Sequence, residues 1–351
     1  MPRSPLELSL KTIVKSIYNL DPLDFSGLRT YPLAGRKSKV SVRDFARPHR
    51  RGARFPEFLE SLPRILGSHD LRAVIAAILR ARIRQKMLLW GFGGHVIKVG
   101  LGPLIADLIE RSFIGGIAMN GSTMVHDFEL ALVGNTSEDV EAGLGSGAFG
   151  MAEETGLYLN EIAKSAARDA IGLGEAAGRM LTSGSLRVRY PQASVLIAAY
   201  RARVPVTVHL AIGTDIPHMH PSADGPALGA STYHDFRLFC SLVKQMHTGG
   251  VYLNWGSAVV LPEVFLKAVS AVRNLGVPLY PITTANFDFI QQYRSLTNVV
   301  RRPTAPLKGA KENLSRGYSI IGHHEVMFPL VAAALVEGAS GMTVRRRTAS
   351  K

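Results

Sequence analysis

The sequence predicts a doubly wound, Rossmann-like α/β fold, in which helices flank a parallel sheet on both faces. Three observations predict it. Short apolar runs end in Gly, Asn or Asp, amphipathic helical segments follow these runs, and unusual polar residues gather where the runs end. Parallel strands that are buried on both faces need such continuous apolar runs. Ligands of these sheets bind beyond the carboxyl ends of the strands.

The elements follow one another in a regular order. The segment LRAVIAAILRARI (71–83) predicts a helix, because its residues are good helix formers with apolar groups three or four positions apart. The expected strands and the turns that follow them lie within 87–95, 115–127, 204–215, 249–257 and 277–286. Helices are expected within 99–112, from Phe128, and within 262–276 and 287–295.

Charge divides the chain into three parts. Residues 1–55 hold twelve Lys and Arg against four acids, and the last seven residues add four bases. Residues 56–344 are nearly neutral, with 25 bases and 23 acids, although the whole chain carries +14. We therefore expect a basic N-terminal arm (1–55), one α/β domain (56–340) and a basic C-terminal tail (341–351). Nucleic acid is expected to bind only through these basic ends, if at all.

Composition also bears on the compartment. The single cysteine, Cys240, excludes an internal disulfide framework and favours a reducing compartment. A run of about 18 apolar residues, the length that spans a bilayer, does not occur. We therefore expect a cytoplasmic protein without a membrane partner.

Two strand ends near the start of the domain carry candidate ligand contacts. Gly91-Phe-Gly93-Gly94-His95 lies between a strand and a helix, where small residues let backbone N–H groups approach a phosphate. The segment from Asn120 to Glu129 places several groups that bond or titrate at the next strand end, including His126. A tight turn and helix capping explain the same residues equally well.

A third cluster suits a metal. His218 and His220 would point the same way in an extended chain, and a carboxylate such as Asp215, Asp224 or Asp235 could complete a divalent site with them. His234 lies close by in the sequence. The alternative is a polar loop whose histidines cap turns.

Three later segments complete the set of polar strand ends. They are Asn254-Trp255-Gly256-Ser257, Thr283-Thr284-Ala285-Asn286-Phe287-Asp288, and Gly322-His323-His324-Glu325, which opens the last helix. Residues of these kinds serve as helix caps. Those of the first two segments are also typical contacts of ribose or amide groups, and the two imidazoles beside Glu325 could bind a metal or shuttle protons.

In this order, these segments resemble the deoxyhypusine synthase family over residues 85–336. Gly91–Leu108 looks like the family's first nucleotide turn, and Asn120–Glu129 with Gly134–Asp139 is similar to the next strand end of its bacterial members. Asp224–Gly229 resembles the family's Asp-Gly-Ser-Leu-Gly turn with one residue inserted, Ile282–Asp288 its Thr-Ala-Gln-Glu-Phe-Asp segment, and Phe328–Ala332 its Phe-Pro-Leu element.

The resemblance implies an NAD-dependent enzyme that forms homotetramers with active sites at subunit interfaces. That family oxidises spermidine and passes an aminobutyl group through an imine on an enzyme lysine to a protein lysine. By position, the resemblance implies cofactor contacts at Gly94, His95, Asn120, Gly121, Asp224, Gly256, Thr284, Ala285 and His323. It places Asp288 near the substrate.

The chain departs from the family at the substrate. The family's Ser-Trp-Gly-Lys segment is absent, so Lys308 or Lys311 would have to form the imine. Val260-Leu261-Pro262 replaces its Lys-His-His, and Gln291-Gln292-Tyr293-Arg294 replaces acids that hold the polyamine. A groove that loses acids and gains Arg294, Arg301 and Arg302 should not prefer a polycation.

We therefore expect a deoxyhypusine synthase-like NAD-dependent transferase or oxidoreductase, acting on a small amine or an anionic metabolite rather than in deoxyhypusine synthesis. Acid and base candidates are His126, Glu129 and His234. The alternatives are a metal-dependent hydrolase or lyase built on His218, His220 and His234, or a non-catalytic homologue. The enzyme hypothesis requires His95, His126, Asp224 and Thr284 to meet at one edge of the sheet.

Overall fold

A computed structural model describes residues 17–18, 20–309 and 312–339, and the chain divides into two units, Met1–Arg43 and Asp44–Lys351. In the first unit all described side chains are exposed, and the short helix η1 (Leu33–Gly35) is its only complete element among them. The compact unit thus begins earlier than the predicted boundary after residue 55. The predicted C-terminal tail, 341–351, lies outside the described residues.

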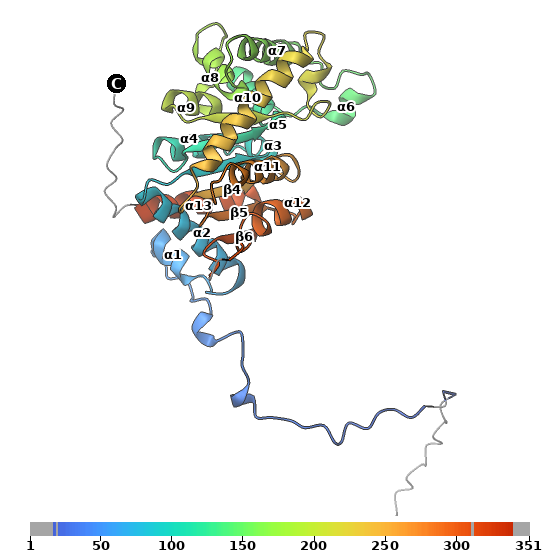
Figure 1. The fold of residues 1–351 in the computed structure, drawn as a ribbon, viewed down its shortest axis with the longest axis vertical. Helices are drawn as coiled ribbons and strands as arrows, with labels where there is room; N and C mark the ends of the chain where they lie inside the picture. Colours follow the sequence, from blue (N-terminus) through green and yellow to red (C-terminus); the bar gives the residue numbers. More distant parts are fainter. Residues whose placement is uncertain (1–16, 19, 310–311, 340–351) are drawn as a thin grey trace, which may run out of the picture. The chain divides into compact units, whose positions relative to one another are not determined.

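The second unit is built on one six-stranded sheet, which confirms the predicted fold class. The order is β3-β2-β1-β4-β5-β6, and all neighbouring strands are parallel (Figure 1). The carboxyl ends therefore share one edge of the sheet. The strands are β1 (Leu88–Phe92), β2 (Gly116–Asn120), β3 (Val206–His209), β4 (Val251–Trp255), β5 (Thr283–Asp288) and β6 (Arg316–Ile321).

Two strands differ from the sequence prediction. We expected a strand within 277–286, but β5 begins only at Thr283, because Pro278 and Pro281 lack the N–H groups that a ladder needs. β6 was not predicted. It lies at the edge of the sheet, and five of its six residues are partly buried or exposed, so it lacks the continuous apolar run of a central strand.

Helices cover both faces of the sheet. One face joins a single core with α2 (Leu66–Ile83), α3 (Gly94–Lys98), α4 (Gly102–Glu110), α5 (Gly121–Val133), α7 (Glu153–Arg168), α8 (Leu173–Thr182), α9 (Val195–Ala202) and α13 (His324–Ala339). The other face packs on α10 (Gly225–Lys244), α11 (Val260–Asn274) and the π-helix η5 (Leu296–Arg301). In Figure 1 the long helix α10 runs from α7 and α8 to α11.

Shorter elements connect these layers. They are η2 (Val42–Asp44), α1 (Phe55–Ser61), α6 (Val140–Leu144), η3 (Pro191–Ala193), η4 (Ile216–Met219) and α12 (Tyr293–Ser295). In the described part of the chain, no helix combines the length and the apolar character that crossing a membrane requires.

The order in which the chain adds strands to the sheet reverses between β1 and β4. The helices that follow β1 lie on one face, whereas α11, which follows β4, lies on the other. At this crossover the Gly93 N–H donates to the Trp255 carbonyl over 2.8 Å. A β-carbon on Gly93 would collide with the Gly256 carbonyl group, and Gly256 itself has a φ of +67°. Both positions therefore need glycine.

A stack of aromatic rings supports the carboxyl edge from below. Trp255 lies parallel to Phe287 at 3.9 Å between ring centroids, and Phe328 meets Trp255 edge-on at 4.9 Å. All three side chains are buried. Because Phe287 precedes Asp288, and Trp255 precedes Gly256, this packing fixes the ends of β4 and β5.

Asp127 ties α5 to α9. Its carboxylate, which is fully buried, accepts hydrogen bonds from the N–H groups of Val195 and Leu196 and from the Ser194 hydroxyl. Burial raises the pKa of Asp127 to about 6, although these three hydrogen bonds oppose the increase. This aspartate therefore holds the start of a helix rather than a ligand.

We predict that Asp127→Ala lowers the free energy of unfolding by about 2–4 kcal/mol, because it leaves two buried N–H groups without an acceptor. Asp139→Ala is the matched control. Asp139 also caps a helix, through the Ala142 N–H, but it is exposed, so its loss should cost less than about 1 kcal/mol. Urea unfolding measures both, and equal losses would contradict a special role for Asp127.

Candidate active site

Imidazole and phenyl rings meet at the carboxyl edge beside the crossover. His95 on α3 lies 5.5 Å from His324, the first residue of α13, and 5.3 Å from Phe289, measured between ring centroids. Phe289 and His323 stack in parallel at 5.7 Å, and both side chains are exposed. Four rings from the ends of β1, β5 and β6 thus meet at this edge.

His324 is the buried member of this group. Its Nε2 lies 3.2 Å from the Phe287 carbonyl oxygen, so Nε2 carries the proton and donates it. Nδ1 is then an acceptor, and it has no hydrogen-bond partner among the described residues. Burial lowers the pKa of His324, and the Phe287 carbonyl and the Asp288 charge oppose this. A neutral imidazole with a free acceptor is a typical feature of a ligand site.

Asp288 lies at the end of β5, close to His324. One carboxylate oxygen lies 3.8 Å from His324 Nε2 and accepts from the Phe289 N–H over 2.9 Å. Asp288 is only 6% exposed. The structure therefore brings Asp288, His95, Gly256 and His323 together around His324.

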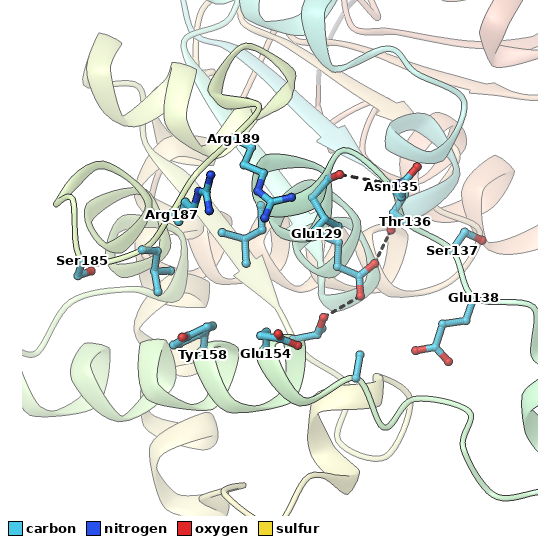
Figure 2. A pocket seen from close by; sticks show the side chains of 15 residues that line it. Glu129, Asn135, Thr136, Ser137, Glu138, Glu154, Tyr158, Ser185, Arg187 and Arg189 are labelled. Carbon is cyan, nitrogen blue, oxygen red and sulfur yellow. Dashed lines mark hydrogen bonds between the residues drawn. The ribbon is translucent and has the colours of Figure 1, made fainter.

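His126 connects this edge to a second group. A β-carbon on Gly94 would lie 3.1 Å from His126 Cδ2 and 2.6 Å from the Ser122 hydroxyl. On its other side, His126 Nδ1 lies 2.7 Å from the Thr136 hydroxyl, which donates to Glu129 over 2.5 Å. The Thr155 hydroxyl donates to the other Glu129 oxygen over 2.9 Å (Figure 2). Two of the three predicted acid/base candidates, His126 and Glu129, thus belong to one hydrogen-bonded chain.

The direction of this chain sets the tautomer of His126. Thr136 has one hydroxyl proton and gives it to Glu129, so it must accept from His126 Nδ1–H. Nε2 is then the unprotonated nitrogen. Burial, and to a lesser extent the charge of Lys98, lowers the pKa of His126 to about 4. His126 is therefore a neutral base at pH 7 rather than an acid.

The residues around the start of α5 bond to one another. Asn120 is the N-cap of α5 and accepts from the Thr123 N–H over 3.0 Å. A β-carbon on Gly121 would collide with the Asp215 carboxylate, which accepts from the Ser122 N–H. Burial raises the pKa of Asp215. A protein carboxylate thus already lies at this helix N-terminus, the position where phosphates bind in many related sheets.

The histidines considered for a metal site bind backbone groups instead. His218 Nδ1 accepts from the Gly213 N–H, and His220 Nδ1 accepts from the Ser222 N–H, each over 3.1 Å. Asp224 caps α10 through the Ala227 N–H, and His234 lies half-exposed on that helix. Within the described ranges, no three His, Cys, Asp or Glu side chains lie close enough to hold a metal ion. Asp235, also considered, accepts from the Val208 N–H inside the fold.

Three predicted residues, Thr284, Ala285 and Lys308, do not join the carboxyl edge. Thr284 is buried near the start of β5, where it donates to the Val299 carbonyl, and Ala285 is buried within the strand. Lys308 is exposed in the loop that leads into the first residue of β6, at the opposite, amino edge of the sheet. Lys311 lies outside the described residues. Of the four residues whose meeting we required, only His95 and His126 come near each other, through Gly94.

Two of the three arginines expected to repel a polycation bind protein side chains. Arg294 forms an ion pair with Glu263 at 3.2 Å, and Arg302 donates to the Asn298 side chain. Arg301 and Arg302 end η5 and precede the Lys308 loop, so they too belong to the amino edge. Among these side chains, only Arg294 follows the end of β5 closely.

Beside Glu129 lies a cavity whose two arginines the prediction did not include. This cavity, of about 550 Å³, lies between α5, the start of α7 and the segment 185–189 (Figure 2). Arg187 and Arg189 line it, together with Glu154 and Tyr158. The alternating pattern Arg187-Val188-Arg189 places both arginines on one side of an extended chain, and this signal could have found them.

Comparisons with known proteins give only weak likenesses. No family model and no curated protein matches the sequence. Among solved structures, an arginine dihydrolase of the ornithine–ammonia cycle in cyanobacteria has a TM-score of 0.45 at 13% identity, covering 80% of this chain and 34% of that one. This chain thus spans about a third of that enzyme's length.

Two further structures are comparable. A conserved protein from Methanococcus maripaludis, provisionally assigned to the LOR/SDH group, has a TM-score of 0.45 at 17% identity and covers 78% of this chain and 70% of its own. A protein from Entamoeba histolytica, provisionally assigned as a deoxyhypusine synthase, has a TM-score of 0.41 at 11% identity and covers 82% and 94%. Likenesses of this strength do not establish a family, a substrate or a reaction.

We predict that the His126 imidazole titrates near pH 4 rather than near 6.5. Since the folded protein then binds fewer protons than the unfolded chain between these values, the free energy of unfolding should fall as the pH is lowered from about 6.5 to 4. NMR of ¹³Cε1-labelled histidine measures the midpoint, and His126→Gln should flatten the pH dependence of stability.

The tautomer provides the control. At pH 7, ¹⁵N shifts should show the proton of His126 on Nδ1, and Thr136→Val should remove this preference. A His126 signal that titrates near 6.5, or one that carries its proton on Nε2, contradicts the hydrogen-bonded chain.

Proposed function

We propose that this protein is a deoxyhypusine synthase-like enzyme that binds a nicotinamide dinucleotide at the carboxyl edge between β1 and β4. The observation that carries the proposal is the crossover, where Gly93 and Gly256 bring the two strand ends into backbone contact. In doubly wound sheets the crevice at such a point is the usual dinucleotide site. The order 3-2-1-4-5-6 is that of the dinucleotide-binding fold itself.

The residues of the edge fit such a ligand. The parallel pair of Phe289 and His323 offers an exposed face on which a flat ring can stack. The free Nδ1 of His324 is a buried acceptor for an amide or hydroxyl proton. The carboxylate of Asp215 at the start of α5 disfavours phosphate there, and so favours phosphate nearer the β1–β4 crevice.

When bound, the nicotinamide would supply a hydride acceptor. His126 would supply the base, because it is neutral and its Nε2 is free to take a proton from an amine or hydroxyl of the substrate. Glu129 would orient His126 through Thr136 and stabilise the imidazolium as it forms. Asp288 would hold a polar or cationic group of the substrate beside His324.

The position of Lys308 bears on the reaction type. An imine-forming lysine must reach the oxidised carbon, but the Lys308 loop lies at the amino edge, away from His95 and His126. We therefore favour oxidation of a small amine or an anionic hydroxy compound over transfer of a group through Lys308. A homotetramer with shared sites, as in the deoxyhypusine synthase family, remains part of the proposal.

We predict that NAD⁺ raises the thermal unfolding temperature of the purified protein. A ligand at 100 times its Kd stabilises the folded state by about 2.7 kcal/mol. His323→Ala, which removes one ring of the stacked pair, should weaken NAD⁺ binding by about tenfold.

Lys308→Ala is the matched control and should leave NAD⁺ binding unchanged, because it alters the opposite edge of the sheet. Calorimetry measures both affinities. A protein that neither carries a dinucleotide after purification nor gains stability from NAD⁺ or NADH contradicts the proposal.

A further inference from the structure

The cavity beside Glu129 has two guanidinium groups without a protein partner. Arg187 and Arg189 are exposed at its rim, and in the described part of the chain neither forms an ion pair or a side-chain hydrogen bond. Their segment is nevertheless fixed, because the N–H groups of Arg189 and Tyr190 both donate to the Ala131 carbonyl of α5. The two charges are thus held at the cavity without being neutralised.

Carboxylates line the other walls of the same cavity. Figure 2 shows Glu154 on α7 across the space from Arg187 and Arg189, with Glu129 on α5 between these two sides. Two hydroxyl hydrogen bonds, from Thr136 and Thr155, fix Glu129. No ion pair joins the arginines to these acids among the residues described, so positive and negative walls face a common space.

Apolar side chains lie between the charged walls. Leu132, Leu186 and Tyr158 line the cavity, and its volume of about 550 Å³ lies within the range of small-molecule sites. A simple anion would pair the arginines but leave the carboxylates facing it. A simple cation would do the reverse.

We propose that this cavity binds a small zwitterion, a molecule that carries a carboxylate and an ammonium group at the two ends of a short apolar chain. Arg187 and Arg189 bind the carboxylate, since guanidinium groups match its geometry. Glu154 and Glu129 bind the ammonium group. The site is separate from the proposed dinucleotide crevice, and its existence does not depend on NAD.

The test uses three probes of equal chain length. They are 6-aminohexanoate with both charges, hexanoate with the anion alone, and hexylamine with the cation alone. Titration calorimetry or saturation-transfer NMR on the full-length protein, with and without NAD⁺, measures their affinities. We expect 6-aminohexanoate to bind at least about tenfold more tightly than either of the others, because each charge-assisted contact contributes separately.

Variants locate the site. The double variant Arg187→Gln/Arg189→Gln should weaken binding of 6-aminohexanoate by at least about tenfold. Arg237→Gln, at an exposed arginine of α10, should leave it unchanged. Equal affinities for the three probes, or a double variant that binds as the wild type does, would overturn the proposal.

A third variant tests binding of the ammonium group separately from binding of the carboxylate. Glu154→Gln changes an exposed side chain, and it should weaken 6-aminohexanoate without altering hexanoate. Circular dichroism checks that each variant is folded. If Glu154→Gln affects both probes equally or neither, the ammonium group does not bind as proposed. Because the probes are measured without NAD⁺ as well, failure of the dinucleotide proposal would leave this result intact.

Discussion

The backbone contact between Gly93 and Gly256 is the constraint on which the rest of the carboxyl edge depends. The helices that follow β1 and β4 lie on opposite faces of the sheet. The two chain segments must therefore turn away from each other directly after this contact. Only residues without a β-carbon permit the Gly93 N–H to reach the Trp255 carbonyl while Gly256 turns against the His324 ring. The aromatic stack of Trp255, Phe287 and Phe328 then fixes the strands beneath.

Polar groups at this edge fall into two kinds, and hydrogen bonding distinguishes them. Asn120, Asp127, Asp215 and Asp224 are satisfied by backbone N–H groups at helix starts, which is a structural role. His324 and His126 keep one free nitrogen each after their bonds are assigned. Burial keeps both rings neutral, with these nitrogens unprotonated, because it disfavours the imidazolium form.

The sequence could predict the fold and part of the site because parallel strands place their carboxyl ends on one edge. Gly94, His95, Gly256 and Asp288 followed from that rule. Thr284 and Ala285 did not, since the polar Thr-Thr pair suggested a strand end, whereas the prolines before it delay β5 so that it begins there. The alternating pattern of Arg187-Val188-Arg189 places both arginines on one side of the chain, but only the hydrogen bonds from Arg189 and Tyr190 to Ala131 of α5 bring this segment to Glu129. Contacts of this kind depend on tertiary packing, and the local sequence pattern does not reveal them.

The hydrogen-bonded chain through Thr136 gives the two proposed sites a physical connection. Glu129 lines the cavity with its carboxylate and, through one hydroxyl, sets the tautomer of His126, which contacts the first glycine turn. An ammonium group placed against Glu129 would weaken the pull of that carboxylate on the Thr136 proton. Thr136 would then accept less strongly from Nδ1–H, and His126 would become a weaker base. A ligand in the cavity should thus lower the basicity of His126 at the carboxyl edge through electrostatics alone, without any movement of α5.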